Sequence, residues 1–109
     1  MQAARSVILT ETGGGGDVAG SGQLVSGACK FLGLLAGNVD GANDMVITIY
    51  RGTKAGTDKD MVVPTATVQD TLDGWVGTNQ AAAEFCPEGL YGVVSGDGTL
   101  TCKVLYQPL

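Results

Sequence analysis

The alternation of apolar and polar residues along the chain predicts short β-strands over most of its length. The clearest strand, 45–51, is largely apolar on both faces, because Met45, Ile47 and Ile49 alternate with Val46, Thr48 and Tyr50. Side chains of a strand point alternately to its two sides, so a strand with two apolar sides belongs inside a covered sheet. We therefore place 45–51 at a central position.

The segment 23–35 is also apolar but is interrupted by glycine. Gly27 and Gly33 make a helix unfavourable and favour a bent or bulged strand. Alternation then places Val25, Cys29, Phe31 and Leu35 on one side, and Leu24, Ala28, Lys30 and Leu34 on the other. A short β-branched run at 6–10 supplies a further strand.

The middle of the chain carries breaker and turn signals. Pro64 separates the runs 61–63 and 65–68, which places this strand at an edge or at a bend. In the following segment, 69–83, Leu72, Trp75 and Val76 could lie on a strand that enters the core, and 81–85 is the only plausible helical turn.

The C-terminal part predicts a β-hairpin. Residues 89–94 and 99–106 flank the turn sequence at 95–98. Alternation turns Cys102 toward the core, and pairing across the turn brings it near Tyr91.

Together these segments predict one domain, 1–109, of the all-β class. About seven or eight short strands with turn signals between them are typical of an antiparallel β-sandwich, and we expect a jelly-roll-like one. The segment 12–22 is rich in glycine and short of apolar side chains, so it is expected to be a flexible arm or loop.

Charge and hydropathy exclude several classes of partner. The net charge is −5, and the six basic residues are scattered along the chain. Nucleic-acid-binding proteins concentrate positive charge against phosphates, and an anionic membrane surface would repel this chain. No apolar stretch approaches the roughly 20 residues that span a bilayer, and the first ten residues do not read as a signal peptide. We expect no nucleic acid or membrane partner and synthesis in a cytoplasm.

The chain contains no histidine, which removes the commonest general base near neutral pH and the Ser-His-Asp and Cys-His arrangements. Neither the run at 13–16 nor Arg51-Gly52-Thr53-Lys54 has the GxxxxGK[ST] pattern that cradles phosphate between a strand and a helix. We therefore expect no catalytic residue, no enzymatic activity and no cofactor.

Two clusters of oxygen-bearing side chains are weaker candidates for sites. The first cluster comprises Asn38, Asp40, Asn43 and Asp44. Its oxygen atoms could bind calcium, but the residues lack the spacing of an EF-hand. The favoured interpretation is a turn in which these side chains form hydrogen bonds with the nearby backbone. The other could form a sugar-binding face in which the indole of Trp75 stacks beside Asp70 and Asp73. A lone tryptophan in a small domain is more often part of the core.

The three cysteines, Cys29, Cys86 and Cys102, are odd in number and have no CxxC spacing. This argues against a self-contained disulfide framework and against a structural zinc site. They are either buried small hydrophobic side chains or, for at least one of them, the source of an intermolecular disulfide in an assembly. The predicted hairpin keeps Cys102 away from Cys86, so a bridge between those two is not expected.

The chain from about Gln23 to Gln107 resembles small virion proteins of tailed bacteriophages and prophages. The matching elements are GACKFLGLLAGN at 27–38, ITIYRGT at 47–53, the steps Val63-Pro64 and Gly74-Trp75, and the closing segment CPEGLYGVVSGDGTLTCKVLYQ at 86–107. The resemblance implies a β-sandwich on the outside of a virion, of the capsid decoration, cement or linking type. The arm at 12–22 would then order on a neighbouring capsomer, and covalent attachment to shell neighbours would explain the cysteines.

We therefore expect a capsid decoration or cement protein that links and reinforces major capsid subunits. Its partners would be the major capsid protein and other virion proteins, and it would be oligomeric in the assembly. It would be located in the virion after synthesis in the host cytoplasm, and a disulfide would form after release from the reducing cell. One alternative is a tail or neck component of the virion, and another is a carbohydrate-binding β-sandwich module.

Overall fold

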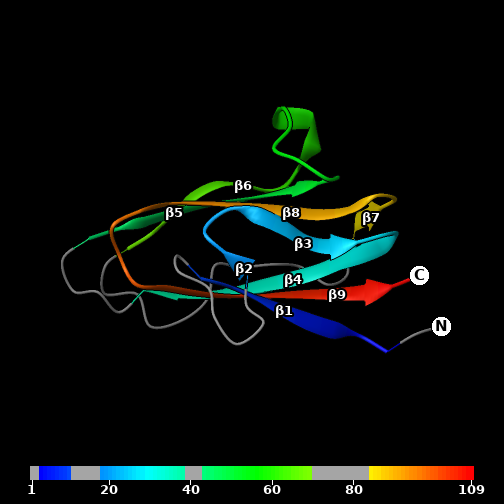
Figure 1. Ribbon diagram of the computed structural model, residues 1–109, viewed down its shortest axis with the longest axis horizontal. Coiled ribbons are helices and arrows are strands. Elements are labelled where there is room, and N and C mark those ends of the chain that lie inside the picture. The colour runs from blue at the N-terminus through cyan, green and yellow to red at the C-terminus, as the bar shows by residue number, and fades with distance from the viewer. Residues whose placement is uncertain (1–2, 11–17, 39–42, 70–83) are drawn as a thin grey trace.

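Alternating burial along the longer strands gives each of them one face in a shared core and one face turned away from it. The computed structural model describes residues 3–10, 18–38, 43–69 and 84–109, and these form two packed sheets (Figure 1). The core between the sheets is built from aliphatic side chains together with Phe31 and the three cysteines.

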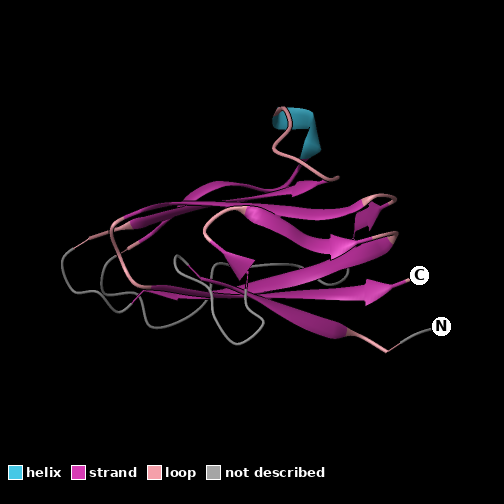
Figure 2. Ribbon diagram, viewed as in Figure 1, coloured by secondary structure: helices cyan, strands magenta, loops and turns pink. Residues whose placement is uncertain are grey.

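The five-stranded sheet has the order β2 (Val18–Ala19), β1 (Arg5–Thr10), β9 (Leu100–Pro108), β4 (Cys29–Asn38), β7 (Glu84–Cys86). The four-stranded sheet has the order β3 (Gly22–Ser26), β8 (Gly89–Gly96), β5 (Met45–Arg51), β6 (Met61–Val68). Neighbouring strands are antiparallel, except that β1 and β2 pair in parallel over two residues. A 3-10 helix, η1 (Asp58–Asp60), projects from the sandwich before β6 (Figure 2).

The strand order is that of a jelly roll. Leaving aside the two-residue β2, successive strands cross from one sheet to the other at every connection but β5 to β6. Two Greek keys folded over each other produce this order. The structure thus confirms the expected all-β sandwich, with nine strands in the described residues when β2 is counted.

The placement of β5 and β6 agrees with the sequence pattern. β5 is hydrogen-bonded on both sides, and Met45, Ile47 and Ile49 are fully buried. β6 forms an edge of its sheet within the described residues, and its register shifts opposite Ile49, next to Pro64. Proline has no N–H for a ladder, so an irregular edge is where it fits.

The expected hairpin is wrong. β8 and β9 belong to different sheets, so the turn at 95–98 forms an arch over the end of the sandwich. Cys102 does face the core, but its ladder neighbours are Leu9 and Ala36, whereas Tyr91 pairs with Tyr50 and Gln23 in the other sheet. A turn signal specifies that the chain reverses, and it does not specify whether the two strands share a sheet.

The segment 23–35 also requires a correction. It is divided between β3 and β4, which lie in opposite sheets and are joined through Gly27 at φ 92°. The expected bulge is present, between Phe31 and Gly33 of β4. An extra residue in a strand reverses the alternation after it, so Leu34 is buried with Cys29, while Leu35 is 45% exposed.

The remaining expectations fall partly outside the described residues. The helical turn expected at 81–85 is wrong for Glu84 and Phe85, which lie in β7 because they pair with β4. In the arm at 12–22, Val18 and Ala19 pair with β1 and Gly22 begins β3, whereas 12–17 lies outside the described residues.

Candidate interaction surface

The outward face of the five-stranded sheet brings together side chains from four strands. Residues that lie directly opposite in a ladder share a face. One row across the sheet is therefore Ile8, Lys103 and Leu35, and a parallel row is Gln107, Lys30 and Phe85. Ser6 and Leu105 lie in a row between these. We call this set the outer face: Ser6, Ile8, Lys30, Leu35, Phe85, Lys103, Leu105 and Gln107.

The outer face exposes large apolar side chains. Leu35 is 45% exposed and Phe85 55%, while Ile8 and Leu105 are half-buried. The third exposed large hydrophobic residue of the described part, Leu109, follows β9 of the same sheet. Single exposed apolar residues are ordinary, but their concentration on one sheet makes that sheet the candidate interaction surface.

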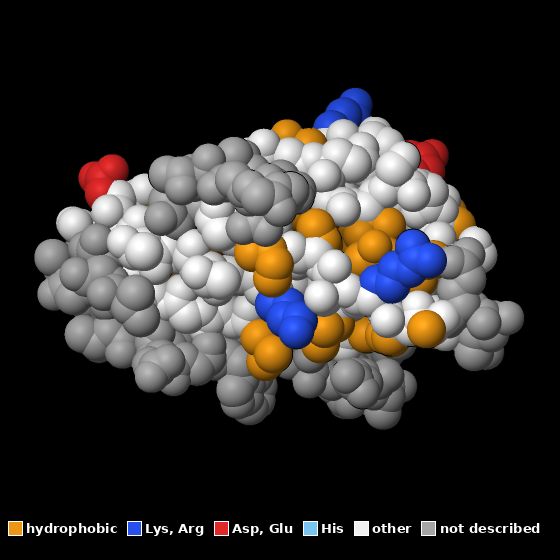
Figure 3. Space-filling view, turned by 60° about the horizontal axis from the view of Figure 1, so that its bottom comes forward, with side chains coloured by type: hydrophobic (Ala, Val, Ile, Leu, Met, Phe, Trp, Pro, Cys, Tyr) orange, Lys and Arg blue, Asp and Glu red, His pale blue; other side chains and the backbone are white. Residues whose placement is uncertain are grey.

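Positive charge lies within this apolar surface. Lys30 and Lys103 are exposed in two of its rows, and Figure 3 shows basic side chains among hydrophobic ones on this side of the molecule. No described acidic residue occupies an outward strand position of this sheet. Glu84 of β7 shares the inward side with Phe31 and forms an ion pair with Arg51 at 3.2 Å. The outer face is locally basic although the chain carries a net charge of −5.

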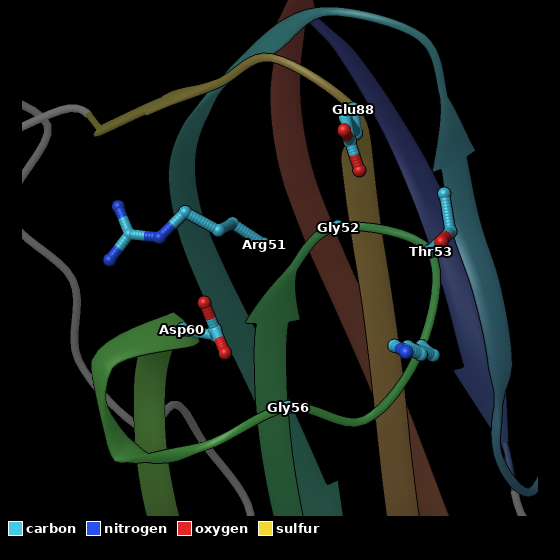
Figure 4. A pocket seen from close by; sticks show the side chains of 7 residues that line it. Arg51, Gly52, Thr53, Gly56, Asp60 and Glu88 are labelled. Carbon is cyan, nitrogen blue, oxygen red and sulfur yellow. The ribbon is translucent and has the colours of Figure 1, made fainter.

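A shallow hollow of about 160 Å³ lies beside the connection from β5 to η1. Its lining holds both signs of charge, and Figure 4 shows Arg51 and Asp60 across the loop from Thr53. The guanidinium of Arg51 donates hydrogen bonds to Glu84 and, at 2.7 Å, to the carbonyl of Lys59. These contacts hold the connection in place, so Arg51 has a structural role here.

Asp60 also stabilises the connection from β5 to η1. Its carboxylate accepts hydrogen bonds from the backbone N–H of Thr57 at 2.9 Å and from the Thr57 hydroxyl at 3.2 Å. The backbone bond is the main reason that the pKa of Asp60 is lowered from its usual value. Among the described residues, every buried side-chain nitrogen or oxygen has a hydrogen-bond partner within the protein, so none of them is left to bind a ligand.

No protein-family model, curated protein or solved structure matches this chain. In the described part there is no helix with the length and hydropathy needed to cross a membrane.

The candidate calcium cluster is not assembled in the described residues. Asn38 is fully buried, and its Nδ2 donates to the carbonyls of Asn43 at 2.9 Å and Val68 at 3.1 Å. Its Oδ1 accepts from the backbone N–H of Thr99 at 3.0 Å. Asn38 thus ties three segments together at one end of the sandwich. No group of three or more His, Cys, Asp or Glu side chains that could hold a metal ion occurs in the described part of the chain.

The candidate sugar-binding residues Asp70, Asp73 and Trp75, and also Asp40, lie outside the described residues. All three cysteines are buried in the core. Burial raises the pKa of Cys29 to about 11 and that of Cys102 to about 12. A disulfide to another chain would require the sandwich to open locally, and that bridge remains a prediction. Sequence reasoning did not identify the pairing of Cys29 with Cys86, which depends on the strand order.

Proposed function

We propose that this chain is a virion structural protein of the capsid decoration or cement type, which links and reinforces major capsid subunits. The observation that carries the proposal is the outer face, where Leu35 and Phe85 are exposed beside Lys30 and Lys103. Jelly rolls are frequent among viral capsid and lectin domains, although a fold alone does not decide a function. The resemblance to small phage virion proteins favours the virion.

The proposed mechanism is adhesion through a sheet face. Removing apolar surface from water stabilises a contact by about 25 cal/mol per Å². The two lysines would orient the chain against acidic groups of the shell and speed its encounter with them. Two of the sheet edges are poorly suited to bind a neighbour by strand addition, because β7 has only three residues and Pro64 interrupts β6.

The test is the copy number of this chain in gradient-purified virions, measured by quantitative mass spectrometry against the major capsid protein. A decoration protein is expected at tens to hundreds of copies per particle. A handful of copies would contradict the shell assignment and support a tail or neck component.

Absence from the particle would overturn the virion proposal altogether. The remaining candidate would then be a carbohydrate-binding module, favoured by the occurrence of lectins among jelly rolls. Binding to a glycan array that is lost in Trp75→Ala would support that candidate.

A further inference from the structure

The short ladder between β4 and β7 places two cysteines directly opposite each other. Its three pairs are Cys29 with Cys86, Lys30 with Phe85, and Phe31 with Glu84. Cys29 and Cys86 are about half the chain apart in sequence, yet they share the inward side of the same sheet.

This arrangement meets the geometric requirement of a disulfide. Directly opposite residues of an antiparallel ladder have Cα atoms roughly 4.5 to 5.5 Å apart, and disulfides join Cα atoms roughly 4.4 to 6.8 Å apart. Burial raises the pKa of Cys29, and the neighbouring Cys86 thiol adds to that rise, as expected for two side chains on the same side of one ladder. The Cys86 thiol itself donates to the carbonyl of Glu84 at 3.6 Å. Both residues are fully buried, so the short strand β7 must open locally before a small disulfide can reach either thiol.

Cys102 provides an internal contrast. It is also fully buried, but its ladder neighbours, Leu9 and Ala36, are both apolar. Among the described ladders, only the one between β4 and β7 aligns two cysteines.

We propose that Cys29 and Cys86 form an intramolecular disulfide that joins β7 to β4 once the protein leaves a reducing environment. The oxidant is a low-molecular-mass disulfide. One cysteine thiolate attacks it and releases one small thiol, and the second cysteine thiolate then attacks the mixed disulfide and releases the other. The two protein thiols lose two protons and two electrons, and the small disulfide is reduced to two thiols.

The bridge would fix an edge of the sheet that few contacts hold. β7 contributes three residues to its ladder, and the ion pair from Glu84 to Arg51 connects it to the opposite sheet. Phe85 lies between Glu84 and Cys86, so the bridge also fixes the position of an exposed aromatic side chain of the outer face. The inference does not depend on the proposed function, because it concerns a single chain.

Burial sets the pH dependence of the step. It raises the pKa of Cys29 to about 11 and also raises that of Cys86, although a hydrogen bond from the Phe31 backbone and the charge of Arg51 partly offset the rise for Cys86. Only the thiolate attacks a disulfide. The rate of bridge formation should therefore increase about tenfold per pH unit from pH 7 to pH 9.

The experiment uses the full chain, purified in reductant and then exposed to oxidised glutathione without denaturant. Remaining thiols are blocked with N-ethylmaleimide at acidic pH. Trypsin and glutamyl endopeptidase then place each cysteine on its own peptide: 12–30 for Cys29, 85–88 for Cys86 and 89–103 for Cys102. We expect 12–30 linked to 85–88, with 89–103 carrying the blocking group, in a protein that runs as a monomer on a non-reducing gel.

Any other linkage overturns the inference: a bridge that includes 89–103, a covalent dimer, or three blocked thiols after prolonged oxidation. The mapping needs only the natural chain, so misfolding of a variant cannot obscure it. As a matched control, Cys102→Ala should retain the link, and Cys86→Ala should lose it. The oxidised protein should also melt roughly 10 °C above the reduced one.

Discussion

The two outward faces of the sandwich differ in how far they cover their own apolar surface. On the four-stranded sheet, Val46 lies between Ser95 and Thr67 and is half-buried. Thr48 points outward from the same sheet and is only 5% exposed, with its hydroxyl 2.8 Å from that of Thr65. On the five-stranded sheet, the exposed hydrophobic side chains are large and have lysines between them.

The two faces therefore differ in how much apolar side-chain area they leave in contact with water. Short hydroxyl-bearing and β-branched side chains cover each other across neighbouring strands. Leucine and phenylalanine at 45% and 55% exposure still leave apolar area in contact with water. We therefore propose the five-stranded sheet, and not the four-stranded one, as the surface that contacts a partner.

The largest expected effect contrasts two adjacent residues of β4. Leu34→Ala removes a side chain that is 1% exposed and should destabilise the fold by about 3 kcal/mol. Leu35→Ala alters the outward side and should cost less than about 1 kcal/mol. Urea unfolding measures both. Equal costs would mean that the bulge at Phe31 does not reverse the alternation as described.

The next effect concerns attachment to the virion. The double variant Leu35→Glu with Phe85→Glu should reduce rebinding to particles that lack this chain about a hundredfold, because it puts carboxylates into the proposed contact. The matched control, Thr67→Glu with Ser95→Glu, adds the same charge to exposed positions of the other face and should bind normally. A larger loss in the control would assign the contact to the four-stranded sheet.

A smaller effect is expected from the lysines. Replacing Lys30 and Lys103 with glutamine should weaken rebinding about tenfold in low salt and much less in high salt, because salt screens exposed charges. Lys54→Gln with Lys59→Gln, at exposed positions of the connection before β6, serves as the control. Binding that is independent of salt in the natural chain would remove charge from the proposed mechanism.

The smallest effect tests how the four-stranded face covers itself. Thr48→Val removes a hydroxyl from the contact with Thr65, and Thr65 is exposed enough to bond water instead. We expect a loss of about 1 kcal/mol or less in the free energy of unfolding, measured in urea, and no change in attachment. Loss of attachment in this variant would show that the face is not complete in the isolated chain.

The sequence pattern predicted those features of the strands that depend on residues close together in the chain. The alternation in 45–51 correctly indicated a central strand, and Pro64 correctly indicated an edge. The outward side of that strand is only partly covered, since Val46 and Tyr50 are half-buried. The bulge in β4 was expected, but its position was not, so Leu34 and Leu35 were assigned to the wrong sides. A shift of one residue reverses the facing of every later side chain in a strand.

Long-range pairing could not be derived in the same way. The turn residues between β8 and β9 are equally compatible with a hairpin within one sheet and with an arch between two sheets. The partners of Cys102 were therefore assigned to the wrong sheet. Cys29 and Cys86 meet because the jelly-roll order places β7 beside β4. The outer face depends on that order as well, since Lys30 and Phe85 come from distant segments.

The most direct test of the outer face as the attachment surface is lysine acetylation of virions compared with the free protein, read by mass spectrometry. We expect Lys30 and Lys103 to be protected on the particle, whereas Lys54 and Lys59, both exposed on the connection before β6, should react equally in both samples. Protection of Lys54 and Lys59, with Lys30 and Lys103 still reactive on the particle, would contradict attachment through the outer face.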